Sequence, residues 1–203
     1  MIALRDLRPE DKEMIRSWRN LPEVAEQMYT SHTIGPEEHE GWFRSIEGDP
    51  KRAYWVVTHA GRDVGLANLY DIDPAHRRCS WAFYIADKAA RARGLGSFLE
   101  YRLLQHVFGE HGFRKLSCEV LTTNQSVLEM HKRFGFREEG RYREHVLKDG
   151  RPVDVVALAV LRPEWESARP AIEKQLEEIK ERLRSRGYLA GDGERAEEET
   201  VGC

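Results

Sequence analysis

The sequence predicts a layered α/β (α+β) domain in which helices flank a single sheet. Segments with the two-residue period of strands alternate with segments of helical period along most of the chain. An apolar content of 40%, with both signs of charge mixed, is ordinary for a soluble globular protein. The length of 203 residues allows one domain of common size and an appendage.

We expect strands where apolar residues alternate with polar ones or run unbroken, at Ile2–Leu7, Arg52–His59, Arg62–Asp71, Cys79–Ala86, Lys115–Leu121 and Val153–Leu161. Helices are expected where apolar residues recur every three to four positions, opening at Pro9, after Gly35-Pro36, near Ser97 and at Asn124. Ala60-Gly61 separates the second and third strands, which predicts a hairpin. No internal repeat interrupts this order.

Charge and cysteine content exclude several classes of function. A net charge of −3 disfavours a general nucleic-acid binder, which needs a strongly basic face. No apolar run approaches the ~18 residues of a membrane span, and no leader segment is evident. Cys79, Cys118 and Cys203 are scattered, so neither a disulfide framework nor a metal site is suggested. We therefore expect a cytoplasmic protein without a metal.

Two glycines mark the loop Arg91-Ala92-Arg93-Gly94-Leu95-Gly96-Ser97, where the strand ending near Ile85 gives way to a helix. The first N–H groups of a helix have no internal partner, and together with the helix dipole they favour an anion. Arg91 and Arg93 add positive charge. The geometry suits a pyrophosphate, although Gly-x-Gly alone also marks ordinary turns.

A second motif follows downstream of this loop. Asn124 is a candidate helix N-cap, and Gly135-Phe136 ends that helix and resumes a strand. With these two motifs the chain resembles the GNAT acetyltransferases, whose pyrophosphate loop has the form Arg/Gln-x-x-Gly-x-Gly/Ala and is followed by a strand, an Asn-capped helix and Gly-Phe. The resemblance implies a central mixed, largely antiparallel sheet flanked by helices.

The resemblance further implies acetyl-CoA as the co-substrate. It assigns the loop Arg91–Ser97 to the pyrophosphate and Asn124 to the cofactor site. It also gives the strand before the loop a backbone role, because in this family that strand is splayed from its neighbour and pairs with the pantetheine arm. Ile85 would lie nearest the acetyl carbonyl, and its N–H would stabilise the charge that develops on that oxygen. For Trp81 and Phe83 the apolar run itself favours a buried central strand, which needs no chemistry.

Acetyl transfer to an amine requires a base for the amine proton and an acid for the departing thiolate. The family commonly places a tyrosine acid at the position of His131, and histidine can also donate a proton at neutral pH. The alternative for His131 is a polar residue on a half-exposed helix face. Glu119 is the candidate base if it lines a cleft, and otherwise a solvent-facing strand residue. His145, Glu144 and Asp154 are weaker candidates.

The acceptor site is expected in the amino-terminal helices. The residues Trp18-Arg19-Asn20, Met28, Ile34-Gly35-Pro36-Glu37-Glu38-His39 and Trp42-Phe43 resemble a subgroup of the family across residues 1–165. That subgroup acetylates the 4-amino group of UDP-4-amino-4,6-dideoxy-N-acetyl-β-L-altrosamine in pseudaminic acid synthesis. The resemblance makes Arg19, Asn20, His39, Trp42, Arg77 (or Arg78) and His145 candidates for binding a nucleotide sugar, while Trp18, Met28 and Phe43 have the spacing of core residues.

Other functions remain open at this stage. Sister families with the same cofactor half acetylate protein N-termini, ribosomal proteins or polyamines, and a polyamine enzyme would have an acidic acceptor cleft. A GNAT-fold module that only binds acyl-CoA as a signal is the non-enzymatic alternative. The sequence favours an N-acetyltransferase that moves acetyl from acetyl-CoA directly to the amine of a UDP-linked amino-sugar.

The chain changes character after Trp165. Residues 166–189 carry Ile172, Leu176, Ile179 and Leu183 at helical spacing, with Pro170 at the expected helix start. This amphipathic helix would dock on its own domain or reinforce a homodimer. Residues 190–203 are rich in glycine and glutamate and are expected to form a disordered charged tail.

Overall fold

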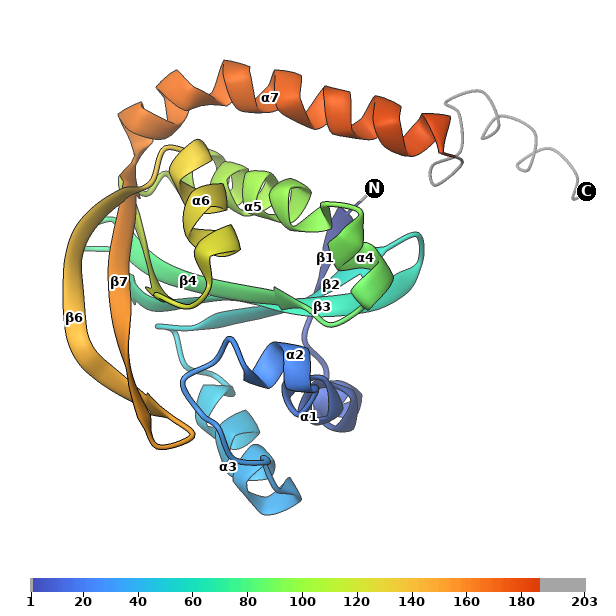
Figure 1. The fold of residues 1–203 in the computed structure, drawn as a ribbon, viewed down its shortest axis with the longest axis vertical. Coiled ribbons are helices and arrows are strands. Elements are labelled where there is room, and N and C mark those ends of the chain that lie inside the picture. The colour runs from blue at the N-terminus through green and yellow to red at the C-terminus, as the bar shows by residue number, and fades with distance from the viewer. Residues whose placement is uncertain (1, 187–203) are drawn as a thin grey trace, which may run out of the picture.

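The computed structural model describes residues 2–186 and contains one seven-stranded mixed sheet, shown in Figure 1. Its strand order is β1-β2-β3-β4-β5-β7-β6, and every neighbouring pair is antiparallel except β4–β5. The strands are β1 (Ile2–Asp6), β2 (Ala53–His59), β3 (Arg62–Asp73), β4 (Arg78–Ile85), β5 (Lys115–Leu121), β6 (Arg137–Lys148) and β7 (Arg151–Leu161). The mixed, largely antiparallel sheet expected from the sequence is confirmed.

Helices cover both faces of the sheet (Figure 1). One face carries α4 (Lys88–Ala92), α5 (Leu95–Gln105), α6 (Gln125–Arg133) and α7 (Arg162–Ser185), with the π-turn η2 (His106–Glu110) extending α5. The other face carries α1 (Lys12–Arg19), α2 (Pro22–Ala25) and α3 (Pro36–Ile46), preceded by the short 3-10 helix η1 (Pro9–Asp11). The larger core lies on the α5 face, where Leu99, Leu103 and Leu116 are fully buried. A smaller core around Ile15 and Val56 lies on the α1 face.

Two-residue turns connect the long hairpins. Ala60 and Gly61 both have positive φ, as do Asp149 and Gly150 between β6 and β7. Turns with two positive-φ residues match the twist of paired strands and are favoured in hairpins. The hairpin expected at Ala60-Gly61 is therefore confirmed.

The sheet opens between its two central parallel strands. β4 and β5 are paired only from Arg78–Ser80 to Lys115–Ser117. β5 stays paired with β7 along its whole length, so it is β4 that parts from β5 after Ser80. A register shift between β3 and β4 lies opposite the same point, between Tyr70 and Asp73. The strands diverge where the sequence analysis expected a splay, and this opening creates the cleft described below.

The segment between β4 and α5 contains a short helix, α4. Asp87 accepts a hydrogen bond from the Ala90 amide and caps α4, a helix that the sequence analysis did not anticipate. Helix α5 begins at Leu95, two residues before the expected start at Ser97, with Gly94 as its N-cap. Asp87 indicates this helix in the sequence, because an aspartate ahead of Lys-Ala-Ala-Arg-Ala favours a capped helix.

Helix α7 begins at Arg162 and runs without a break past Pro170, which lies inside it. The expected border at residues 165/166 and the expected helix start at Pro170 therefore fall within a continuous helix. Its Ile172 and Leu176 are buried against the main core of this chain. The tail proposed for residues 190–203 lies outside the described residues. Among the helices of residues 2–186, none combines the length and apolar character needed to cross a bilayer.

Candidate active site

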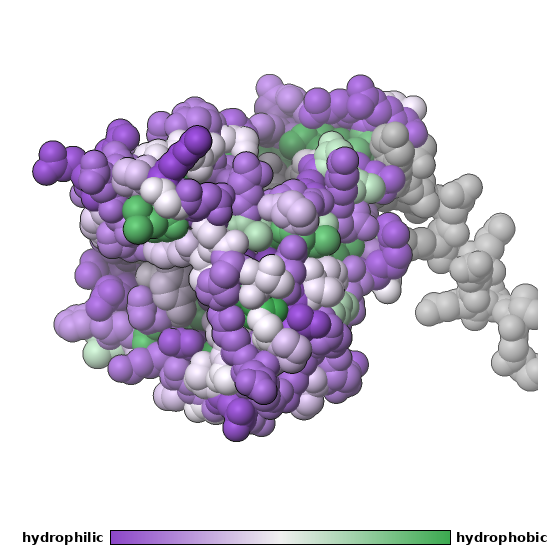
Figure 2. All heavy atoms as spheres, turned by 60° about the horizontal axis from the view of Figure 1, so that its bottom comes forward, coloured by the Kyte–Doolittle hydropathy of each residue, from purple (hydrophilic) through white to green (hydrophobic). Residues whose placement is uncertain are grey.

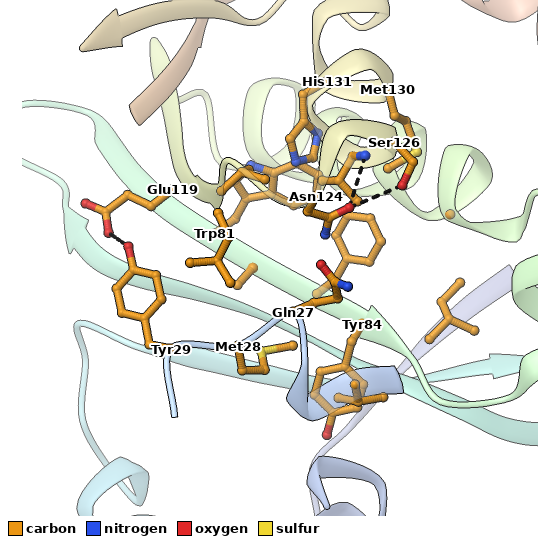
Figure 3. A pocket seen from close by; sticks show the side chains of 18 of the residues that line it. Gln27, Met28, Tyr29, Trp81, Tyr84, Glu119, Asn124, Ser126, Met130 and His131 are labelled. Atoms are coloured by element: carbon orange, nitrogen blue, oxygen red, sulfur yellow. Dashed lines mark hydrogen bonds between the residues drawn. The ribbon is translucent and has the colours of Figure 1, made fainter. Parts of the chain in front are cut away.

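A cavity of about 660 Å³ occupies the opening between β4 and β5. Its walls come from both faces of the sheet, as the close view in Figure 3 shows: α6 contributes Met130 and His131, and the segment after α2 contributes Gln27, Met28 and Tyr29. We call this cavity the cleft. Because it joins the α5 face to the α1 face, it can receive two different molecules from opposite sides.

The edge of β4 that faces the cleft presents backbone amides to it. The Ala86 amide donates to the Val64 carbonyl at 2.7 Å, which directs Ala86 and, by antiparallel alternation, Tyr84 toward β3. Phe83 and Ile85 therefore point their amides away from β3, toward the side where pairing with β5 has ended. This arrangement fits a ligand with amide groups of its own, as expected for the pantetheine arm.

The predicted phosphate loop forms the first turn of α5 beside the cleft. Gly94 has a φ of 74°, a conformation that glycine adopts at little cost, and it turns the chain into the helix. Leu95 and Gly96 present helix N-terminal amides of the kind that attract anions, whereas the Ser97 amide donates to the Gly94 carbonyl at 3.1 Å. Of the expected cofactor residues, Ile85, Arg91, Gly96 and Asn124 line the cleft, whereas Ala92, Arg93, Gly94, Leu95 and Ser97 lie beside it.

Arg91 is engaged in a structural role. Its Nη1 donates to the carbonyl oxygens of Ile85 at 2.7 Å and Ala86 at 3.2 Å. Its Nη2 forms an ion pair with Glu23 of α2 at 2.9 Å. Arg91 therefore ties the end of β4 to the helices of the opposite face, and both of its Nη atoms are engaged by protein groups.

Asn124 caps α6 as expected. Its Oδ1 accepts hydrogen bonds from the Val127 amide at 3.4 Å and from the Ser126 hydroxyl at 3.2 Å (Figure 3). This cap holds the first turn of α6 over the cleft and fixes where His131 emerges, two turns along the helix. Asn124 thus acts on the site through the position of α6 as well as by lining the cleft.

His131 is buried, not half-exposed, and it forms an ion pair with a residue that the sequence analysis did not name. Nδ1 of His131 lies 2.8 Å from Oε1 of Glu100 on α5, and the side chains are 4% and 0% exposed. Burial alone would lower the pKa of His131, but the Glu100 carboxylate and a contact with Cys118 outweigh it and raise that pKa to about 10. His131 lines the cleft, where a protonated imidazole can act as an acid.

Glu119 lies on the opposite wall of the cleft from α6 and is exposed to solvent at its mouth. Its Oε2 accepts a hydrogen bond from the Tyr29 hydroxyl at 2.5 Å (Figure 3). Burial, and then this hydrogen bond, raise the pKa of Tyr29, so the phenol stays protonated and donates. The carboxylate can accept a proton from an amine that enters from the α1 face.

A second cavity of about 290 Å³ adjoins the cleft beneath α1 and α3. We call it the side chamber. The two cavities share Arg19, Met28 and Tyr84 among their lining residues. Trp42 and Tyr54 supply aromatic walls, and the His39 ring stacks on Trp42 with ring centroids 4.9 Å apart. Flat aromatic walls with a few polar groups are typical of small-molecule sites.

Buried polar atoms without a hydrogen-bond partner gather around these two cavities. They are Arg19 Nη1, Gln27 Oε1, His39 Nε2, Trp81 Nε1 and the Tyr84 hydroxyl. Each such atom costs about 1–3 kcal/mol when left unpaired, so folding alone does not favour their concentration here. Burial lowers the pKa of Arg19 and of His39 and raises that of Tyr84, as expected for groups held away from water. The set includes both hydrogen-bond donors and acceptors.

Three of the expected acceptor residues line neither cavity. Asn20 uses both ends of its side-chain amide on the backbone of Ile34, which is a structural role. Arg77, with Arg78, lies at the paired end of β4 beside β5, away from the splayed end that borders the cleft. His145 lies at the rim, with its ring 6.1 Å from Tyr29 and 5.0 Å from Tyr142. The structure brings together only Arg19, His39 and Trp42 at the side chamber.

The surface on the α1–α3 side is mostly hydrophilic. Figure 2, which brings this side forward, shows hydrophobic residues in small separate patches. Within residues 2–186, no group of three or more His, Cys, Asp or Glu side chains has an arrangement that could hold a metal ion. Cys79 and Cys118 are free and buried, and Cys203 lies outside the described residues.

Comparisons with known proteins agree on one family of acetyltransferases. The family profile described as "Acetyltransferase (GNAT) domain" matches residues 2–137. Acetyltransferase PseH of Campylobacter jejuni is 24% identical over 139 residues, covering 67% of this chain and 85% of that protein. Phosphinothricin N-acetyltransferase of Streptomyces coelicolor is 31% identical over 131 residues, covering 63% of this chain and 76% of that protein. A structure of spermidine N-acetyltransferase from Vibrio cholerae with CoA and spermine has a TM-score of 0.75 at 23% identity, and the match covers 81% of this chain and 97% of that one.

Proposed function

The chain belongs to the GNAT acetyltransferase family and uses acetyl-CoA as its co-substrate, and on this premise we propose that its acceptor is a UDP-linked amino-dideoxy sugar. The acetyl group is transferred directly to the 4-amino group, as in the synthesis of nonulosonates of the pseudaminic acid type. The likeness to PseH supports this assignment at low identity.

The observation that carries the proposal is the unpartnered polar set around the cleft and side chamber. A nucleotide sugar has hydroxyl, amide and phosphate oxygens along one molecule and so offers partners to donors and acceptors alike. Arg19 reaches both cavities and suits an anionic or carbonyl oxygen. The stacked His39 and Trp42 suit the flat face of a sugar or base ring. The acceptor we propose therefore extends from the cleft into the side chamber.

A polyamine acceptor fits these residues less well, although spermidine N-acetyltransferase shares the fold. Burial lowers the pKa of Arg19, and its Nη1 has no hydrogen-bond partner. A second cation brought beside it would add repulsion in a site with little water. Glu23, which could attract a polyamine at the cleft, is paired with Arg91.

A panel of amine acceptors tests the proposal. The full-length protein is mixed with acetyl-CoA and, separately, with UDP-4-amino-4,6-dideoxy-N-acetyl-β-L-altrosamine, the same amino-sugar without UDP, spermidine, and a peptide with a free N-terminus. Release of free CoA thiol is followed, and the products are examined by mass spectrometry. We expect the UDP-linked sugar to have the highest kcat/KM, at least tenfold above the free sugar. Equal or faster acetylation of spermidine or of the peptide would contradict the proposal.

A further inference from the structure

Glu100 is a carboxylic acid in the interior of the main core. It lies on α5 among Leu99, Leu103 and Leu104, and it has no solvent exposure. Glutamate is rarely buried unless it is paired, because removal of its charge from water is unfavourable. The position could be filled by an apolar residue that matches its neighbours. A function for the carboxylate therefore has to come from the group it contacts.

That group is the imidazole of His131 on the neighbouring helix α6. Oε1 of Glu100 lies 2.8 Å from Nδ1 of His131, and the other carboxylate oxygen, Oε2, has no partner. His131 lines the cleft whereas Glu100 does not. The carboxylate therefore contacts the imidazole from outside the cleft, and its hydrogen bond with Nδ1 fixes the orientation of the ring.

The remaining surroundings of the pair are mostly aromatic. Trp81 of β4 and Phe136 lie against the His131 ring, with centroids 5.4 Å and 5.1 Å away. Burial raises the pKa of Glu100, whereas the charge of His131 and the hydrogen bond between the two groups lower it. The other titratable neighbours are the Cys118 thiol of β5, which contacts His131, and Arg133, whose charge also lowers the pKa of Glu100. In such surroundings an imidazole without a carboxylate partner would lose its proton, because burial disfavours the charged form.

An acid is needed on this side of the cleft. When the amine nitrogen bonds to the acetyl carbon and the C–S bond breaks, sulfur departs with its electron pair and must take up a proton. An unperturbed imidazole has a pKa of about 6.5 and is mostly deprotonated above neutral pH. His131 can supply the proton only if a partner keeps it charged.

We propose that Glu100 is a positioning residue that orients His131 and keeps its imidazole protonated, so that His131 returns a proton to the CoA sulfur. The inference rests on the proposed acetyl transfer. The amine proton goes to Glu119, and a proton passing through solvent from Glu119 to His131 restores both groups for the next turnover. Protons therefore balance over one cycle, with an amide and a CoA thiol as products.

The first arm of the test measures the proton directly and needs no acceptor. NMR of the full-length protein labelled with ¹³C at the histidine rings is recorded from pH 5.5 to 9, with the His131→Asn spectrum assigning the signal. We expect the His131 ring of the wild type to stay protonated over this range. In Glu100→Gln, which keeps the shape and a hydrogen-bond acceptor, the ring should titrate below pH 7.

Glu110→Gln is the matched control. Glu110 also pairs with a histidine, His106, at 2.6 Å on the extension of α5, but at the surface and away from the cleft. This variant should leave the His131 signal unchanged. Circular dichroism and CoA binding by calorimetry confirm that each variant is folded.

The second arm measures rates with acetyl-CoA and the UDP-linked amino-sugar. For Glu100→Gln we expect kcat at pH 7.5 to fall at least tenfold, with the KM for acetyl-CoA within twofold, and the alkaline limb of the kcat profile to move to lower pH. A tyrosine hydroxyl has a pKa of about 10 without a partner. The double variant Glu100→Gln with His131→Tyr should therefore recover much of the lost rate.

The two arms separate the failure of this inference from that of the proposed function. A wild-type His131 that is neutral at pH 7, or one that titrates identically in Glu100→Gln, would overturn the role of Glu100. So would an unchanged pH profile of kcat in an active Glu100→Gln enzyme. A wild-type protein inactive on every amine would instead contradict the proposed function, while the NMR titration would still decide whether Glu100 holds the proton on His131.

Discussion

The Tyr29 hydroxyl donates a hydrogen bond to Oε2 of Glu119 at 2.5 Å, joining the segment after α2 to strand β5 across the mouth of the cleft. The same segment is held by Lys148 of β6, whose Nζ donates to the carbonyl oxygens of Ala25, Met28 and Thr30. These contacts place Glu119 at the entrance through which an acceptor amine would arrive from the α1 face.

We predict that Glu119→Gln lowers kcat about 100-fold, the range typical for loss of a general base. The KM for acetyl-CoA should stay within twofold, because Glu119 lies opposite the helices that frame the cofactor side. Steady-state kinetics with both substrates measure this. Glu139→Gln is the control, since Glu139 pairs with Lys115 on the neighbouring surface and does not line the cleft. A kcat within twofold of wild type would remove Glu119 as the base.

Gly96→Ala should stabilise the fold and weaken the binding of CoA. Gly96 is helical, and a Cβ there would lie 3.6 Å from Sδ of Met130 and 3.9 Å from the Phe83 ring, which is ordinary contact. Alanine in a helix stabilises by about 0.5–1 kcal/mol relative to glycine. The added methyl group, however, enters the cleft between α5 and α6, so we expect the Kd for CoA to rise about tenfold.

Thermal unfolding and calorimetry with CoA measure the two effects. Gly109→Ala in η2 is the matched control, because a Cβ there meets no atom within 4 Å and lies away from the cleft. The control should change CoA binding by less than twofold. Unchanged CoA affinity in Gly96→Ala would contradict the placement of the cofactor beside the first turn of α5.

Arg19→Met tests the side chamber. The free energy of unfolding should stay within about 1 kcal/mol of wild type, because the lost hydrogen bond to Thr30 is offset by removal of a buried, partly unpaired charge. The KM for the UDP-linked sugar should rise at least tenfold, with the KM for acetyl-CoA unchanged. Arg44→Met serves as the control, since Arg44 is exposed and pairs with Glu40. An acceptor KM unaffected by Arg19→Met would show that the acceptor does not reach this chamber.

The Glu100–His131 pair predicts how stability depends on pH. The pKa of His131 is raised in the folded state to about 10, against about 6.5 unfolded. A raised pKa contributes stability that is fully present below pH 6.5 and is lost as pH rises toward 10. The free energy of unfolding should therefore fall over this range, by up to about 1.4 kcal/mol per pH unit for one proton.

Urea denaturation at pH 6.5, 8 and 9.5 measures this decline. The double variant Glu100→Gln with His131→Gln removes both titrating groups. Its free energy of unfolding should fall less steeply with pH, by the slope that corresponds to about one proton. If wild type and double variant lose stability in parallel as pH rises, the pair does not hold a proton in the folded state.

Much of the scaffold could be predicted from local sequence pattern. The strand Lys115–Leu121 has the expected bounds, and Asn124 caps its helix as expected. Both signals are short-range, since alternation and an N-cap act within a few residues. The family resemblance then supplied the splay between β4 and β5, which no local pattern could show.

Residues whose roles depend on distant contacts were predicted less well. Asn20 bonds Ile34 and Arg91 bonds Glu23, and neither partner is evident from spacing along the chain. Arg77 precedes the cofactor strand directly, but the cleft lies at the other end of that strand. Glu100 did leave a signal, because it occupies the apolar stripe of α5 three and four residues before Leu103 and Leu104. A lone charge on such a stripe indicates a buried partner.

A structure of the protein with CoA and the UDP-linked amino-sugar would test the central claim most directly. We predict the diphosphate of CoA at the amides of Leu95 and Gly96, its sulfur next to His131, and the acceptor amine near Glu119, with nitrogen and sulfur about 3–4 Å apart as reacting groups require. Binding of CoA outside the opening between β4 and β5, or an acceptor amine remote from Glu119 and His131, would contradict this account.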